Sequence, residues 1–148
     1  MEDINIKQIK HNSTEYELEL ELRNELLRKP LGLNIYDEDL EQEKNDIHLG
    51  AFRKKELVGT LILKILNEQK LKMRQVAVKK SLQGNNIGTK LVKYAENYAV
   101  KKGYQIIKLN ARKTAVPFYE KLGYEKIGDE FMEVSIPHFK MQKSLYKE

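Results

Sequence analysis

A change of hydrophobic period constrains the fold of this chain more than any other feature. Residues 47–53, 57–66 and 71–78 alternate apolar and polar positions, as half-buried β-strands do. A charged turn at 53–56 and a second turn at 67–70 separate them, so the three segments predict an antiparallel meander. Outside this region, apolar residues recur with the spacing of a helix.

Amphipathic helices are predicted on both sides of the meander. The first covers residues 14–28 and is ended by Pro30. The second covers residues 88–102, and Gly103 suits the position just beyond its last turn. The apolar face of this second helix consists of Leu91, Val92, Ala95, Tyr98 and Ala99.

The remaining segments complete a layered architecture. The order β-α-β-β-β-α-β-α-β-β predicts an α/β (α+β layered) fold with a mixed sheet and helices on its faces. A chain of 148 residues favours a single domain, residues 1–148. The other expected elements are strands at 4–9, 105–110, 124–128 and 137–146, a helix at 115–122, and a loop at 32–46 with a short helical turn at 37–43.

Composition excludes several classes of protein. No apolar run approaches twenty residues, so we expect no membrane span. The absence of cysteine excludes disulfides, thiolate zinc sites and a cysteine nucleophile. The polar first ten residues do not resemble a secretory signal, and the simplest interpretation is a cytoplasmic protein. The three histidines lack ligand spacing, so we expect no metal.

The net charge of +5 is unevenly distributed. Acidic residues dominate 13–46, and basic residues dominate 70–113. These stretches are either solvated faces or walls for a cationic and an anionic partner. The basic stretch keeps a nucleic-acid-binding domain as a rival hypothesis. We expect no nucleic acid, because Tyr94 and Tyr98 suit helix packing better than base stacking.

The stretch SLQGNNIGT, residues 81–89, is the main candidate for chemistry. Gly84 and Gly88 flank a helix start, where backbone N–H groups lack partners and the helix dipole is positive. Asn85 and Asn86 tolerate left-handed backbone better than most residues. Composition alone leaves two alternatives open, a phosphate-binding turn and an ordinary loop before a helix. The GK[ST] and GxGxxG patterns of nucleotide-binding loops are absent.

Two motifs together point to a family. The run VAVKKSLQGNNIGTKLV resembles the acyl-CoA-binding motif of the GCN5-related N-acetyltransferase (GNAT) superfamily, with Gln83 and Gly88 matching its first and last defined positions. Asn86 stands where the middle glycine usually lies. The run LNARKTAVPFYEKLGYEKIG, residues 109–128, resembles the second motif of that family through Phe118, Tyr119, Gly123 and Tyr124. The chain is identified as a small single-domain member.

The resemblance implies a fold and an activity. The fold is a mixed, mostly antiparallel central sheet with helices on both faces. The activity is transfer of an acetyl group from acetyl-CoA to a primary amine of a small molecule or peptide, by direct transfer in a ternary complex. The alternative is a catalytically degenerate module that binds or senses acyl-CoA. Small members of this family often pair, so a homodimer is one further implication.

The resemblance also assigns cofactor contacts by position. Pantetheine pairs with the strand backbone, the pyrophosphate lies on the loop, and Asn110 contacts the cofactor near its thioester end. The matching strand positions are Val76, Ala77 and Val78. The matching loop positions are Gln83, Gly84, Asn85, Asn86, Ile87, Gly88 and Thr89.

Catalytic and acceptor residues are assigned in the same way, each with a structural alternative. Tyr119 would protonate the leaving thiolate, or would be an ordinary core aromatic. His138, in the segment IPHFKM, would bind the acceptor or act as general base, or would be a buried strand residue. Arg23 and Arg28 would bind a carboxylate or phosphate of the substrate, or would be solvated. Asp46 and Glu133 are further candidates for the base.

Overall fold

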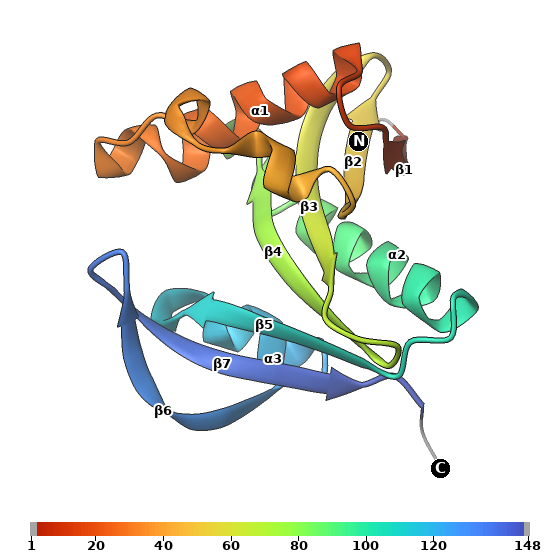
Figure 1. Cartoon of the computed structure of the whole chain (residues 1–148), viewed down its shortest axis with the longest axis vertical. Helices are drawn as coiled ribbons and strands as arrows, with labels where there is room; N and C mark the ends of the chain where they lie inside the picture. Colours follow the sequence, from red (N-terminus) through yellow and green to blue (C-terminus); the bar gives the residue numbers. More distant parts are fainter. Residues whose placement is uncertain (1–2, 147–148) are drawn as a thin grey trace. The chain divides into compact units, whose positions relative to one another are not determined.

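The computed structural model describes residues 3–146 and contains one mixed sheet (Figure 1). Its seven strands are hydrogen-bonded in the order β1-β2-β3-β4-β5-β7-β6. The pairs β1–β2, β2–β3, β5–β7 and β6–β7 are antiparallel, whereas β4 and β5 are parallel. With three α-helices in the described chain, this mostly antiparallel arrangement confirms the predicted fold class and element order.

The described chain forms two compact units. The first contains the residues up to Lys64 together with Gln75–Ala95, and the second contains Ile65–Arg74 together with the residues from Glu96 onward. Strand β4 and helix α2 therefore contribute residues to both. The prediction of a single domain over 1–148 stays a prediction, and residues 1–2 and 147–148 lie outside the described part.

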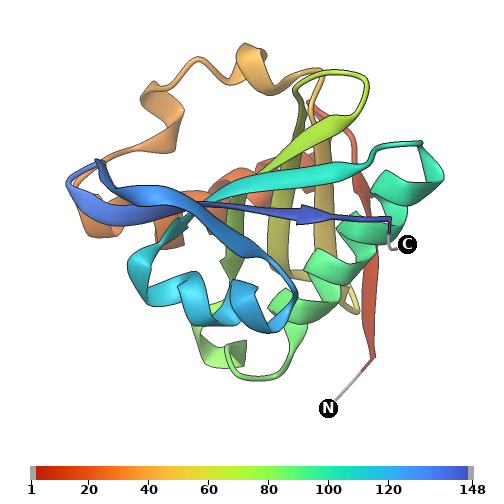
Figure 2. The same cartoon turned by 90° about the horizontal axis from the view of Figure 1, so that it is seen from below.

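The first unit begins with a strand and a helix and then turns into the meander. Its segment between helix and meander was expected to be a loop with one turn, and it contains three short 3₁₀ helices (Figure 2). These are η1 (Lys29–Leu31), η2 (Ile35–Asp37) and η3 (Leu40–Glu43). The other elements of this unit are β1 (Ile4–Ile9), α1 (Thr14–Leu27), β2 (Ile47–Arg53), most of β3 (Glu56–Ile65), the end of β4 (Lys70–Val78), η4 (Lys80–Leu82) and the start of α2 (Ile87–Lys101).

Local sequence explains where α1 begins and ends. The Ser13 hydroxyl accepts a hydrogen bond from the Tyr16 backbone N–H at 3.1 Å, which caps the first turn. The helix ends at Leu27 with Arg28 as its C-cap, because Pro30 cannot continue it. Gly32, with a left-handed φ of 73°, then ends the short helix η1. None of the helices in residues 3–146 is both long and apolar enough to cross a membrane.

The apolar core of the first unit holds α1 against the strands. Its buried members come from β1, α1, η2, β2 and β3, so one cluster joins segments that are distant in sequence. Burying such side chains contributes roughly 1.5–3 kcal/mol each. The cluster consists of Ile9, Tyr16, Leu20, Ile35, Phe52 and Leu57.

One predicted strand boundary in the second unit is wrong. Strand β6 runs from Glu125 to Glu133, whereas the sequence predicted a strand ending at 128 and then a loop. The hairpin turn consists of Val134 and Ser135, both with positive φ. A turn without glycine or asparagine carries no sequence signal of the usual kind, so the hairpin was missed. The other elements are β5 (Ile106–Arg112), η5 (Lys113–Ala115), α3 (Val116–Lys121) and β7 (Ile136–Ser144).

Candidate functional site

In the first unit, the end of β4 departs from regular strand geometry. The register of β4 with β5 ends at Met73↔Leu109. Gln75 then adopts a φ of 57°, the left-handed region that a side chain makes unfavourable. A left-handed residue within a strand redirects the residues that follow it. Those residues, Val76–Val78, are the predicted pantetheine-binding positions, and Ala77 is the buried one.

The loop after β4 contains two residues with left-handed backbone. Gly84 has a φ of 88°, and Asn86 has a φ of 63°. Asn86 therefore adopts a left-handed conformation that favours glycine and that asparagine tolerates better than most residues. The side-chain amide of Gln83 donates to the Val78 carbonyl at 3.1 Å, and that of Asn85 donates to the Leu82 carbonyl at 3.2 Å. Both side chains thus fold back onto the loop itself.

The helix start behind this loop leaves N–H groups available. The first bond of the α2 ladder runs from the Lys90 N–H to the Asn86 carbonyl at 3.0 Å. The N–H groups of residues 86–89 precede that ladder and have no partner within it. Ile87 is buried and anchors the first turn, whereas Gly88 and Thr89 are half-buried. Free N–H groups and a positive helix dipole fit the diphosphate of coenzyme A.

In the second unit, Tyr119 is a buried phenol on α3. Only 7% of its surface is exposed, and its ring packs edge-on against Phe118 and Tyr124, with centroids 4.9 Å and 5.8 Å away. Burial raises the pKa of Tyr119 to about 12. The phenol is therefore protonated at neutral pH and can act as a proton donor.

Three further polar groups of the second unit lie together. The Asn110 amide donates to Glu133 Oε1 at 3.1 Å, and His138 Nε2 lies 3.5 Å from Glu133 Oε2. His138 is 4% exposed, and its Nδ1 lies 2.7 Å from the Ile136 carbonyl oxygen. A carbonyl oxygen only accepts hydrogen bonds, so Nδ1 carries a hydrogen. In the neutral ring, Nε2 then holds the lone pair.

The two arginines predicted to bind substrate are both engaged inside the first unit. Arg23 is fully buried, and its Nη1 lies 2.8 Å from Glu19 and 2.7 Å from Glu43. A guanidinium that is buried and paired in this way cannot reach a substrate, so the structure argues against the predicted role of Arg23. Arg28 is also paired, with Glu38 and Gln75.

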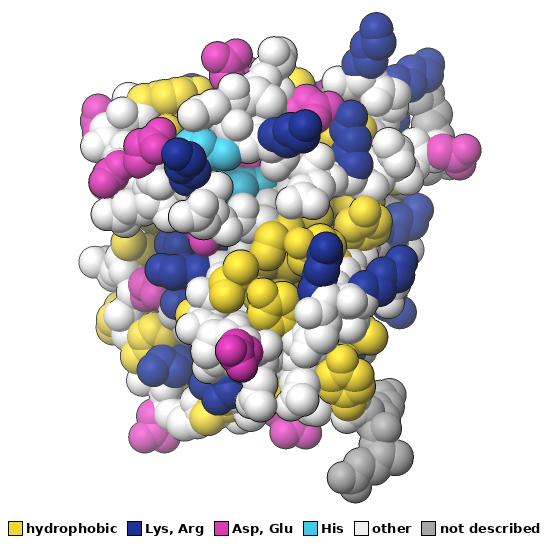
Figure 3. Space-filling view, turned by 45° about the vertical axis from the view of Figure 1, so that its right-hand side comes forward, with side chains coloured by type: hydrophobic (Ala, Val, Ile, Leu, Met, Phe, Trp, Pro, Cys, Tyr) yellow, Lys and Arg dark blue, Asp and Glu magenta, His cyan; other side chains and the backbone are white. Residues whose placement is uncertain are grey.

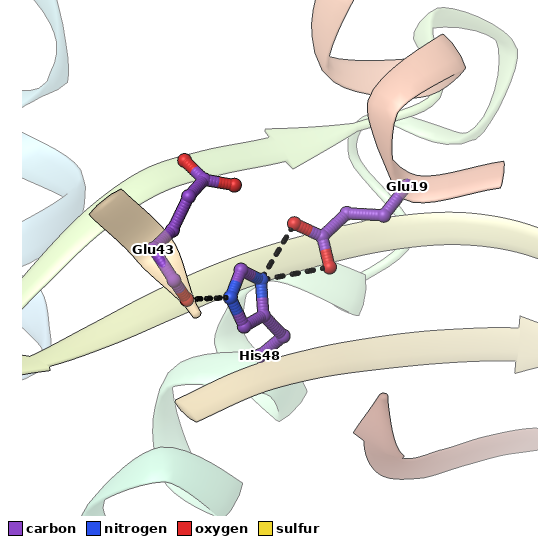
Figure 4. Close-up of side chains that lie close together, drawn as sticks. All are labelled: Glu19, Glu43 and His48. Carbon is purple, nitrogen blue, oxygen red and sulfur yellow. Dashed lines mark hydrogen bonds and ion pairs between the residues drawn. The ribbon is translucent and has the colours of Figure 1, made fainter. Parts of the chain in front are cut away.

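His48 completes the buried network around Arg23. Figure 4 shows its contacts with Glu19 and Glu43. Its Nδ1 lies 2.8 Å from Glu19 Oε2, and its Nε2 lies 2.9 Å from the Glu43 carbonyl oxygen. Both ring nitrogens face acceptors, an arrangement that favours the doubly protonated imidazolium. Two carboxylates are then balanced by two cations, since Arg23 and His48 oppose Glu19 and Glu43. Burial alone would lower the pKa of His48, but the hydrogen bond and charge of Glu19 outweigh it and raise that pKa.

The same cluster bears on the prediction of no metal site. Ligand atoms of Glu19, Glu43 and His48 lie within 4.8 Å of one another, which is close enough for a metal ion. Here Arg23 already bonds both carboxylates, and His48 donates to one of them. An ion would have to displace these partners, so we assign the cluster a structural role. The absence of a bound metal stays a prediction.

Comparison with known proteins identifies the family. A family model described as the acetyltransferase (GNAT) domain matches residues 23–145. The chain belongs to the GNAT acetyltransferase family. This match covers both motifs on which the resemblance depended, the VAV-to-helix segment and the segment containing Tyr119.

Individual relatives of this GNAT chain agree with the family and the fold. A candidate acetyltransferase of Bacillus subtilis (strain 168) is 32% identical over 96 residues, which span 65% of each chain. The match thus covers less than two thirds of that relative's length. The crystal structure of a candidate N-acetyltransferase from Lactobacillus plantarum superposes with a TM-score of 0.87 at 20% identity, covering 97% of this chain and 99% of that one. An aminoglycoside 6′-N-acetyltransferase complexed with coenzyme A gives a TM-score of 0.80 at 22% identity, covering 97% and 98%.

Two structural features of this GNAT chain were not predicted from its sequence. The family resemblance implies a bulge in this strand, but Gln75 is an ordinary polar residue in a strand pattern, and no local signal places the left-handed backbone at that residue. The buried role of Arg23 did carry a signal, because Arg23 lies seven residues from Tyr16 and three from Leu20 on the apolar stripe of α1. Glu19, one turn earlier, has the spacing of an ion-pair partner.

The buried imidazolium predicts a pH dependence of stability. The pKa of His48 is raised in the folded state, so its stabilising contribution is complete below the unfolded pKa of about 6.5 and is lost as pH rises through the folded pKa. We expect the difference in free energy of unfolding between wild type and His48→Gln to shrink as pH increases from neutral toward alkaline values. Urea unfolding at several pH values measures this difference. A difference that stays constant with pH would show that His48 is neutral in the folded protein.

Proposed function

We propose that this GNAT chain is an acyl-CoA-dependent N-acetyltransferase that acts on a primary amine of a small molecule or peptide. The observation that carries the proposal is the start of α2, where left-handed Gly84 and Asn86 precede N–H groups without helical partners. When bound, acetyl-CoA would supply a thioester carbonyl for direct attack by the amine. Without a cysteine in the chain, we propose no covalent acyl-enzyme on a thiol.

The residues that would hold the cofactor are those of β4 and the loop. The backbone of residues 83–89 would hold the pyrophosphate, through the N–H groups of residues 86–89, because those of Gln83 and Asn85 already bond the Lys80 and Leu82 carbonyls. The backbone of Val76–Val78 would pair with the pantetheine arm and stabilise developing negative charge on the carbonyl oxygen. Holding the two reactants together would remove much of the entropic cost of their encounter. We also propose that Asn110 contributes near the thioester end.

Tyr119 would donate a hydrogen bond to the leaving thiolate. Desolvation raises the pKa of its phenol to about 12, so the proton is in place at neutral pH. A free thiol has a pKa of roughly 8.5, so complete proton transfer from this phenol to a thiolate is uphill. Tyr119 would therefore act by donating a hydrogen bond to the sulfur while the thioester bond breaks, and the thiolate would leave as such or take its proton from water.

His138 would accept the proton that the amine loses. Its Nδ1–H is held by the Ile136 carbonyl, which leaves the Nε2 lone pair as the proton acceptor. The Glu133 carboxylate lies 3.5 Å from Nε2 and would orient the ring. Glu133 also bonds Asn110, so one carboxylate would orient both groups.

Two rival functions make different predictions. A degenerate acyl-CoA-binding module would bind the cofactor without releasing thiol on any amine. The left-handed φ of Asn86 suits cofactor binding in both hypotheses, so thiol release distinguishes them. A nucleic-acid-binding domain would need a continuous basic surface. On the face drawn in Figure 3, lysine and arginine side chains are scattered among acidic, hydrophobic and polar ones. This scatter favours the enzyme.

Gly88→Glu tests the cofactor cradle. A carboxylate in the first turn of α2 would place bulk and negative charge at the proposed pyrophosphate site, so we expect acetyl-CoA binding to be lost. Calorimetry with acetyl-CoA measures the affinity. Asn97→Glu, exposed on the same helix, adds the same charge away from its start and should bind normally. Normal affinity of Gly88→Glu would refute the cradle.

Tyr119→Phe tests the proton donor. The ring and its packing stay while the proton is removed, so we expect kcat to fall roughly 10- to 1000-fold with little change in acetyl-CoA affinity. The Tyr124 hydroxyl donates to Glu96 at 2.9 Å, so Tyr124→Phe is a matched control that should retain kcat. Thiol release during turnover provides the rate. Unchanged turnover in Tyr119→Phe would remove Tyr119 from the mechanism.

His138→Gln tests the proton acceptor. We expect kcat/KM to fall roughly 100-fold at pH 7 and the loss to become smaller at pH 9, where more of the amine is already free base. Rates across this pH range, with a reactive primary amine, measure the effect. A loss of the same size at every pH would indicate that His138 positions groups and does not take the proton.

A further inference from the structure

Arg28 joins the end of α1 to the irregular point of β4. Its Nε and Nη2 lie 2.6 Å and 3.1 Å from the two carboxylate oxygens of Glu38, and its Nη1 lies 3.1 Å from the side-chain oxygen of Gln75. Nη1 also lies 3.3 Å from the Leu27 carbonyl oxygen. All three guanidinium nitrogens therefore have partners within the first unit, and 13% of the side chain is exposed.

The residue that Arg28 contacts has an unfavourable backbone conformation. Gln75 has a φ of 57°, which a residue with a side chain adopts only when its surroundings hold it there. The hydrogen bond from Arg28 is such a restraint, and the two-pronged pair with Glu38 fixes the guanidinium that makes it. A planar fork with fixed donors restrains its partner more firmly than a flexible ammonium would.

The restraint on Gln75 affects the proposed cofactor-binding segment because Gln75 lies directly before that segment. Val76, Ala77 and Val78 follow it directly, and their direction depends on the φ of Gln75. At their far end, the Gln83 amide bonds the Val78 carbonyl at 3.1 Å. The segment is thus held at both ends by side chains, from Arg28 at its start and from Gln83 at its end.

We propose that Arg28 is a positioning residue for acyl-CoA binding: by holding Gln75 in the left-handed conformation, it directs the backbone of Val76–Val78 toward the pantetheine arm. This inference rests on the proposed function and replaces the expectation that Arg28 binds substrate. In this inference, Gln75 is the residue whose left-handed backbone must be kept so that the edge of β4 can pair with the pantetheine arm.

The test combines three variants. Arg28→Met removes the donor of the Arg28–Gln75 hydrogen bond while keeping an unbranched side chain. Gln75→Ala removes the acceptor of the same bond. Gln75→Gly in the Arg28→Met background makes the left-handed conformation available without a restraint. Lys29→Met is the matched control, because Lys29 is exposed and pairs only with Glu25 among the interactions described for it. Thermal unfolding of each variant shows which remain folded.

We expect Arg28→Met and Gln75→Ala each to raise the Kd for acetyl-CoA about tenfold, with kcat at saturating cofactor unchanged within about twofold. The effects of these two substitutions should not add, because they break the same contact. Gln75→Gly should return the Kd of Arg28→Met to within about threefold of the wild-type value. Lys29→Met should bind as the wild type does.

Three results would overturn the inference. An unchanged Kd in folded Arg28→Met and Gln75→Ala would show that the contact does not position the strand. A raised KM for the amine that Gln75→Gly cannot rescue would return Arg28 to substrate binding. Wild-type protein that binds no acetyl-CoA would refute the proposed function, and this inference would fail with it. In the first two results, by contrast, the wild-type protein still binds acetyl-CoA and only the role of Arg28 is refuted.

Discussion

The proposed acyl-CoA chemistry depends on one constraint of the backbone between residues 75 and 89. There the chain must leave a strand, turn, and begin a helix with its N–H groups unpaired. Left-handed residues at Gln75, Gly84 and Asn86 meet this requirement. Gly84 adopts this conformation without a side-chain penalty. Asn86 depends on the tolerance of asparagine for left-handed backbone, and Gln75 depends on the hydrogen bond from Arg28.

A second constraint anchors the segment between α1 and β2. The buried set of Glu19, Arg23, Glu43 and His48 ties the helix, the 3₁₀ turn η3 and strand β2 together through charge-balanced hydrogen bonds. Breaking such a buried pair by removing one partner typically costs about 3–5 kcal/mol, because the remaining charge is left unpaired. Because its charges are buried and already paired, we assign this network a structural role and not a ligand-binding one.

The family and most of the fold could be predicted from sequence, because local patterns carry them. The alternating strands of the meander and the apolar face of α2 depend on side-chain period, which is visible in one dimension. The two motifs then pointed to the GNAT family, which the match over residues 23–145 bears out. The β6–β7 hairpin was missed because Val134 and Ser135 form its turn without the usual turn residues.

For the candidate site, the sequence determined which residues are available: a loop with Gly84, Asn86 and Gly88, a phenol at Tyr119 and a histidine at 138. Only the tertiary structure decided what their neighbours do. It buried Arg23 between carboxylates, gave Gln75 a partner 47 positions away in Arg28, and placed Glu133 between Asn110 and His138. The physical reason is that these arrangements depend on contacts between distant segments: the spacing along α1 indicates an Arg23–Glu19 pair, but no local pattern encodes the contacts with Glu43, Gln75 or Glu133.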